Sequence, residues 1–186
     1  MRRAIGLVAA LLLLVAAPAA AQDHDASPEV FALFQADQAA RGAADVTNDA
    51  LREAADTARR QQLRALVDRG ALKTADDYLF ASVVFQHGFG DDILLAHALA
   101  TVALARGKVE AAVMVASSLD RYLMDQGRPQ IYGTQFMIPF NGEPVTQAPY
   151  VPDLLTDDMR RAVGVPSLAE QDDQRRAYEA GRQTPQ

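Results

Sequence analysis

Along most of this chain, apolar residues recur at helical spacing. Val30, Leu33 and Phe34 lie at i, i+3 and i+4, which places them on one face of a helix. Ser-Pro at 27–28 comes just before them, and serine at the N-cap with proline at the first helical position is typical of a helix start. The pattern predicts a first helix that ends near Gly42.

A longer amphipathic helix is predicted between the cap-forming residues at 45–48 and Gly70. Its charged residues form oppositely charged pairs four positions apart, as on a solvated helix face. The apolar positions share the other face, and they are Leu51, Ala55, Ala58, Ala65 and Leu66.

The apolar segment at 78–85 is flanked by helix signals on both sides. Thr74 and Asp77 have the spacing of a capping box in front of it, and Gly88 and Gly90 follow as a helix stop and a turn. Periodicity alone leaves a strand open, because the segment is rich in β-branched and aromatic residues. The flanking signals favour a helix.

Two further helices are predicted at 91–105 and 109–126, with a short glycine-containing break between them. The first is apolar on all sides except at His97 and Thr101, so it should be central to the core. Short turns make consecutive helices antiparallel. The sequence therefore predicts a three-helix antiparallel stack at 75–126.

The pattern changes at 127–152, where five prolines and three glycines fall within 26 residues. Asn-Gly at 141–142 favours a tight turn, so this segment should form a short irregular hairpin or ordered loop. Thr156 then caps a short helix, and a last helix starts near Ser167. The last helix is so polar at 170–181 that it should lie on the surface or fray.

These elements predict an all-α fold: an antiparallel helical hairpin stack with a short irregular hairpin or loop after the core helices. The expected organisation is a loose N-terminal tail and first helix at 22–44, one helical domain at 45–181 and a loose tail at 182–186. A chain of this length fits a single domain.

The N-terminus, at 1–21, has the pattern of a secretory signal peptide. Met-Arg-Arg is followed by an apolar run at 5–17 and by small residues that end at Ala21. We expect cleavage after Ala21 and export to the periplasm or the medium. The apolar run is shorter than the roughly 20 residues that a spanning helix needs, and no later segment qualifies, so no membrane span is expected in the mature chain.

The amino-acid composition excludes several kinds of functional group and partner. The chain has no cysteine, which excludes disulfides, thiolate nucleophiles and thiolate metal ligands. Loss of Arg2 and Arg3 with the signal peptide changes the formal net charge from −6 to −8, and such an acidic chain is a poor fit to nucleic acid. No cofactor signature is present, and the histidine and carboxylate spacings match no zinc pattern. We therefore predict neither a cofactor nor a metal.

Hydrogen-bonding side chains are concentrated at 120–135, where the last core helix gives way to the proline-rich segment. If this segment folds back over the helices, its side chains could meet two histidines and line a pocket, with histidine as base or donor and arginine as anion clamp. The candidate catalytic residues are His87, His97 and Asp120. The candidate ligand-binding residues are Arg121, Gln130, Tyr132 and Gln135.

Both histidines also have structural explanations. His87 lies at a predicted helix C-terminus, where the helix dipole favours a cation. His97 could be a core histidine that is hydrogen-bonded to a neighbour such as Thr101 or Asp120.

The polar side chains at 121–135 have a structural alternative as well. Arg121 can reach Asp125 at i+4 and form a surface ion pair. Gln130, Thr134 and Gln135 can satisfy backbone groups of a loop that folds over helix ends. The sequence leaves open whether these residues fasten the loop or line a pocket.

Three short strings resemble those of a known group of proteins. They are Gln86-His87-Gly88, Leu95-Ala96-His97, and Asp120-Arg121-Tyr122-Leu123 followed by Gly127 to Gln135. The chain resembles a bacterial family of unknown function whose members share Q-H-G, D-R and P-Q-x-Y-G-T-Q strings in this order. The resemblance covers roughly residues 50 to 170, and it implies a similar fold and site region but no particular activity.

Two classes of function follow from these features. The first is an exported helical domain that binds a small ligand or a partner protein through a polar His/Asp/Arg/Gln cluster. It is favoured because no nucleophile with a base and an orienting group is visible. The alternative is a hydrolase-like enzyme that uses His87 or His97 as general base.

Overall fold

The computed structural model describes residues 7–10, 24–42, 49–139 and 141–183. The predicted cleavage site at Ala21, the cap-forming residues at 45–48 and the last three residues lie outside these ranges. The helices are α1 (Pro28–Gly42), α2 (Asp49–Asp68), α3 (Ala75–Phe85), α4 (Asp91–Ala105), α5 (Ala111–Asp125), α6 (Asp157–Ala162) and α7 (Leu168–Gln183). Two short strands, β1 (Leu7–Ala10) and β2 (Gln135–Ile138), and a 3₁₀ turn at Pro152–Leu154 complete the described elements. The packed helices confirm the predicted all-α fold.

The capping box predicted in front of α3 is present. Thr74 Oγ1 accepts the N–H of Asp77 at 3.0 Å, and the Asp77 carboxylate accepts the N–H of Thr74 at 3.1 Å. Two N–H donors at the start of the helix are thereby satisfied, and the segment at 78–85 is helical. The flanking signals, rather than the β-branched composition, decided its structure.

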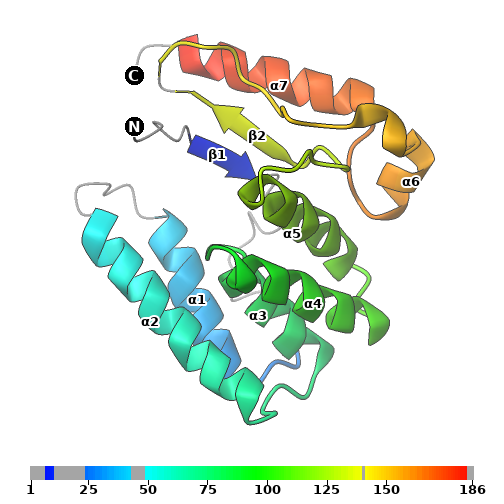
Figure 1. The fold of residues 1–186 in the computed structure, drawn as a ribbon. Helices are drawn as coiled ribbons and strands as arrows, with labels where there is room; N and C mark the ends of the chain where they lie inside the picture. The colour runs from blue at the N-terminus through cyan, green and yellow to red at the C-terminus, as the bar shows by residue number, and fades with distance from the viewer. Residues whose placement is uncertain (1–6, 11–23, 43–48, 140, 184–186) are drawn as a thin grey trace.

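The α1 helix shares its core with the helices that follow it. Val30 and Phe34 are buried together with Leu63 of α2 and Val84 of α3. Figure 1 shows α1 and α2 side by side at one end of the molecule, with α3, α4 and α5 stacked next to them. The first helix and the segment at 49–105 therefore form one continuous apolar core.

Residues 24–27 are not the loose tail that their polarity predicts. The N–H of Asp25 donates to Asp76 Oδ2 at 3.1 Å, and that of Ser27 donates to Asp77 Oδ1 at 2.7 Å. The ring of His24 lies 3.9 Å from that of Phe31. Carboxylates at the start of α3 thus hold this segment, and local composition gave no sign of these contacts.

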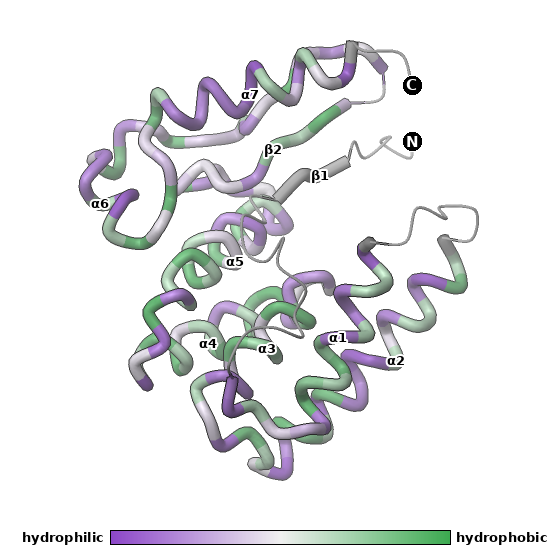
Figure 2. Tube along the Cα trace, turned by 180° about the vertical axis from the view of Figure 1, so that it is seen from behind, coloured by the Kyte–Doolittle hydropathy of each residue, from purple (hydrophilic) through white to green (hydrophobic). Residues whose placement is uncertain are grey.

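Alanine lines the contacts of α3, α4 and α5. These helices are joined by short turns and therefore run antiparallel, as predicted. Small side chains at the contacts let the helix axes approach closely. The buried alanines of these helices are Ala81, Ala96, Ala100, Ala103, Ala111 and Ala116. Figure 2 shows the hydrophobic colour concentrated on α3 and α4, the helices that the sequence placed at the centre.

The segment after α5 folds back over the end of that helix. Met137 of β2 exchanges backbone hydrogen bonds with Thr146 at 2.7 and 3.1 Å across the turn at 141–142, which is the predicted irregular hairpin. The other side of β2 pairs antiparallel with β1. Helix α7 covers β2, and the rings of Phe136 and Tyr178 lie 5.2 Å apart (Figure 1).

The C-terminal helices begin close to the predicted positions. Thr156 Oγ1 accepts the N–H of Met159 at 3.2 Å and caps α6. The polar segment at 170–181 lies within α7 on the surface, with four ion pairs between residues three or four positions apart. No helix within the described ranges is long and apolar enough to cross a membrane.

Candidate functional site

Asp120 is a buried carboxylate that fastens the loop after α5. Its Oδ1 accepts the backbone N–H groups of Ile131 at 2.8 Å and Tyr132 at 3.0 Å. Its Oδ2 accepts the N–H and the hydroxyl of Thr134, both at 2.9 Å. All four bonds go to one turn of the chain, so the geometry favours the structural explanation for Asp120 over a catalytic role.

A relay of hydrogen bonds leads from Asp120 to Arg121. Thr134 Oγ1 donates to Asp120 and accepts the side-chain amide of Gln135 at 3.0 Å. The same amide nitrogen donates to Ser117 O at 3.3 Å. Since both bonds use Nε2, the amide oxygen must point the other way, where Arg121 Nη2 donates to it at 3.2 Å. The side chains of Asp120 and Arg121, which are adjacent in the sequence, are thus connected by hydrogen bonds that pass through the loop.

Gln130 also fastens the loop. It is fully buried, and its amide oxygen accepts the N–H of Gln135 at 2.9 Å. Its amide nitrogen donates to Gln135 O at 2.9 Å and Gln147 O at 2.6 Å. The backbone of Gln130 bonds Pro149 O and the N–H of Val151. Every side-chain polar atom of Gln130 is used within the loop, which leaves none for a ligand.

Tyr132 contributes mainly through its carbonyl. That oxygen accepts the Tyr150 hydroxyl at 3.2 Å and the Gln171 amide at 2.9 Å. Burial, with the nearby charge of Asp120, raises the pKa of the Tyr132 hydroxyl, so the group stays protonated at neutral pH.

Two buried polar residues of this region were missed by sequence analysis. Arg160 of α6 is fully buried and donates to Leu155 O at 2.7 Å, to Pro152 O and to the Tyr150 hydroxyl. Gln171 of α7 donates to Tyr132 O and accepts the side-chain amide of a loop glutamine. Each resembles an ordinary surface residue of a charged helix in the sequence, so no local pattern could have identified it.

A cavity of about 290 Å³ opens where the turn between α3 and α4 meets α5 and β2. Arg121 and Gln135, the residues at the end of the relay, are among its lining residues. Phe89, 70% exposed, lies at its rim. The remaining lining residues are Gly88, Ile93, Met124, Asp125 and Met137. Two of the four predicted ligand-binding residues therefore line one mainly apolar pocket.

Within the described ranges, the guanidinium of Arg121 has neutral partners only. Nη1 donates to Gln86 O at 3.3 Å and Nη2 to the Gln135 amide oxygen, while Nε is buried without a partner. No carboxylate among the described residues forms an ion pair with it. The sequence predicted an i+4 ion pair between Arg121 and Asp125, and this prediction is wrong. The Asp125 carboxylate instead accepts the N–H of Gly90 and the side-chain amide of Gln126. Burial, and secondarily the charge of Arg41, lower the pKa of Arg121.

His87 forms a pair with Asp37 of α1. Its Nδ1 lies 3.0 Å from the Asp37 carboxylate, which also accepts Arg41 at 2.9 Å. Burial lowers the pKa of His87 and outweighs the opposing effect of the carboxylate. Burial raises the pKa of Asp37, but His87 and Arg41 outweigh it, so this pKa lies below its usual value. At neutral pH the pair is a carboxylate with a neutral imidazole that donates from Nδ1.

This pair should give the protein a pH-dependent stability. A lowered folded-state pKa means that unfolded His87 binds a proton at pH values where the folded residue does not. The free energy of unfolding should therefore fall as the pH drops below about 6.5, with up to about 1.4 kcal/mol lost per pH unit. His87→Gln should lose this component in urea titrations from pH 5 to 7.5. An identical pH slope in both proteins would contradict it.

His97 lies apart from His87. Its Nδ1 lies 3.0 Å from Val115 O on α5, with Ser118 Oγ at 3.5 Å. The predicted side-chain partners Thr101 and Asp120 are both wrong: the threonine hydroxyl donates to the His97 carbonyl, and the carboxylate is occupied by the loop. His97 links α4 to α5, and the two histidines share no partner among the described residues.

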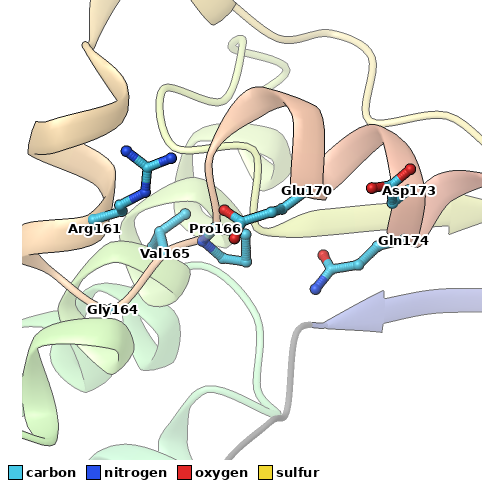
Figure 3. Close-up of a pocket in the computed structure, with 7 residues that line it drawn as sticks. All are labelled: Arg161, Gly164, Val165, Pro166, Glu170, Asp173 and Gln174. Carbon is cyan, nitrogen blue, oxygen red and sulfur yellow. The ribbon is translucent and has the colours of Figure 1, made fainter.

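A second hollow, of about 520 Å³, lies between α6 and α7. Figure 3 shows Arg161 entering it from α6 and Glu170, Asp173 and Gln174 from α7. Glu170 is already used, because its carboxylate accepts the N–H of Ser167 at 2.8 Å and caps α7. None of the residues predicted for a site lines this hollow.

No metal site in the described part of the chain and no similar known protein indicates which ligand or reaction this chain serves. Among the residues with described positions, no group of three or more histidine or carboxylate side chains is placed to hold a metal ion. No protein-family model, no curated protein and no solved structure matches the chain.

Proposed function

We propose that this chain is an exported helical domain that binds a small ligand in the cavity between the α3–α4 turn, α5 and β2. The relay from Asp120 through Thr134 and Gln135 to Arg121 carries the proposal. A buried carboxylate fixes the loop, the loop fixes an amide, and the amide holds a guanidinium at a mainly apolar pocket. Concave, mostly apolar sites with a few oriented polar groups are typical of small-molecule binding.

The hydrolase alternative has less support. The Asp37–His87 pair resembles an oriented general base, because a carboxylate fixes Nδ1 and leaves Nε2 as an acceptor. However, His87 does not line the cavity, and His97 is bonded elsewhere. No serine or threonine hydroxyl is bonded to His87 among the described residues, so the activation that a nucleophile requires is not apparent.

Export is the second half of the proposal. It is supported by the basic start, the short apolar run and the small residues that end at Ala21. Intact-mass analysis of the protein from an envelope or culture-medium fraction should give a chain that begins at Gln22. A product retained in the cytoplasm with Met1 in place would contradict export and leave the pocket unaffected.

Filling the cavity tests ligand binding. The larger side chain in Met137→Trp should fill the apolar part of the pocket. In NMR titrations with fragments of different charge, the methyl and amide signals of pocket residues should shift in wild type and stay unchanged in this variant. Met159→Trp on α6 is the matched control, since Met159 is exposed and outside the cavity. Equal fragment binding to wild type and Met137→Trp, or no fragment bound at the cavity, would overturn the proposed function.

A further inference from the structure

We infer that the ligand is a small monocarboxylic acid with an apolar body, bound through its carboxylate to Arg121. The inference rests on the proposed function and adds the chemical class of the ligand. It is drawn from three properties of the cavity: an arginine without a counter-ion in the described part of the chain, a charge pattern that suits a single negative charge, and apolar walls of limited volume.

Arg121 has unused binding capacity. A guanidinium carries five N–H groups, and only two of those of Arg121 have partners, at 3.3 and 3.2 Å. Both partners are neutral carbonyl oxygens, which orient the cation without balancing its charge. A carboxylate is the natural complement, because it can accept two parallel hydrogen bonds from the planar guanidinium.

The surroundings of Arg121 are unusual for an arginine of this chain. Most of the arginines that form ion pairs within the described ranges have a carboxylate partner in their own helix, as Arg64 has Asp68 at 2.8 Å. Arg121 instead forms no ion pair with any described carboxylate, and its partners are the carbonyl oxygens of Gln86 and Gln135. Burial of a charge without a partner is unfavourable, so the arrangement is best explained by a ligand that supplies the missing anion.

The cavity suits one negative charge rather than two. Arg121 is its only basic lining residue, and the carboxylate of Asp125 also lies in its wall. Asp125 accepts the N–H of Gly90 at 3.2 Å, which holds it at the rim. A doubly charged phosphate would need a second cation to balance it, whereas the single charge of a monocarboxylate is balanced by Arg121.

The rest of the wall selects an apolar body. Ile93, Met124 and Met137 surround the space, and Phe89 lies at the entrance. The two methionines can adapt to chains of different shape. At about 30 Å³ of liquid volume per water-sized group, a cavity of 290 Å³ holds a ligand of about ten non-hydrogen atoms. Octanoate has this size and composition.

Matched probes separate the class of ligand from the existence of a site. Calorimetry or NMR titration of the full mature chain should be carried out with octanoate, octanamide and acetate. We expect octanoate to bind at least about tenfold more tightly than octanamide, because a charge-assisted pair replaces a neutral one. Acetate should bind at least about tenfold more weakly than octanoate, because it lacks the apolar body.

The arginine variant supplies the second arm. Arg121→Gln should remove the preference for octanoate and leave the affinity for octanamide within about threefold of wild type, because only the charged contact is lost. Arg176→Gln, on the exposed face of α7, is the control that should change neither value.

Each remaining outcome counts against the inference. Octanamide bound as tightly as octanoate, or acetate bound as tightly as octanoate, would overturn the ligand class while leaving a small-molecule site. Retention of the octanoate preference in Arg121→Gln would place the anion elsewhere. If no probe binds at the cavity and Met137→Trp behaves as wild type, both the ligand class and the proposed function fail.

Discussion

Asp120→Ala should lower the free energy of unfolding by about 3 kcal/mol or more, because it removes the acceptor of four buried hydrogen bonds at once. Bonds to a charged acceptor contribute roughly 1.5–3 kcal/mol each, and a buried donor left unpaired costs about 1–3 kcal/mol. Water entering the space would satisfy part of the set. Urea titration monitored by circular dichroism measures the change.

Asp158→Ala is the control for this prediction. Its side chain is 98% exposed, so its loss should change the free energy of unfolding by no more than about 0.5 kcal/mol. If Asp120→Ala were as mild as Asp158→Ala, the loop after α5 would not depend on the buried carboxylate.

Gly133→Ala should cost about 2–5 kcal/mol. The residue has a positive φ of 79°, and an L-residue in this conformation costs roughly 1–2 kcal/mol. A Cβ at this position would also lie 2.6 Å from the Tyr150 ring and overlap the Gln171 amide oxygen. Those atoms belong to side chains that hold the loop to α6 and α7, so moving them adds an overpacking cost of about 1–3 kcal/mol.

Gly142→Ala separates the two costs. Its φ of 83° is nearly the same, but no atom lies within 4 Å of the added Cβ. It should therefore lose only the conformational part, about 1–2 kcal/mol. Equal losses in Gly133→Ala and Gly142→Ala would show that Gly133 is not tightly packed against Tyr150 and Gln171.

The helices could be predicted because their signals are local. Ser-Pro at 27–28, the box formed by Thr74 and Asp77, and the cap at Thr156 each specify a helix start within a few residues. The apolar spacing then fixes which face is buried. These signals placed the starts of α1, α3 and α6 without knowledge of the tertiary structure.

The site could be predicted only in part, because its decisive contacts join distant segments. The string at 120–135 was identified, but whether each residue fastens the loop or lines a pocket depends on the direction of its side chain. Asp37 reaches His87 across 50 positions, and Gln171 reaches Tyr132 across 39. No spacing rule connects such residues, since Asp37 and Gln171 lie on helices of ordinary pattern, far along the chain from the turn and the loop that hold His87 and Tyr132.

The sequence did not separate the residues at 120–135 that fasten the loop from those that line a pocket, and the structure does. Asp120 and Gln130 are fully used within the loop, whereas Arg121 has spare donors and no counter-ion among the residues that the structure describes. A buried charge without a partner contributes little to stability and can reduce it. Arg121 is therefore expected to serve binding at some cost to the fold, while the relay that holds it serves the fold itself.

The most direct test of this division is the unfolding free energy of Arg121→Met measured beside that of Asp120→Ala. The division of roles predicts that Arg121→Met stays within about 1 kcal/mol of wild type or is more stable, while its neighbour on α5 loses about 3 kcal/mol or more. Equal and large losses in both variants would contradict it and would make Arg121 one more fastening of the loop.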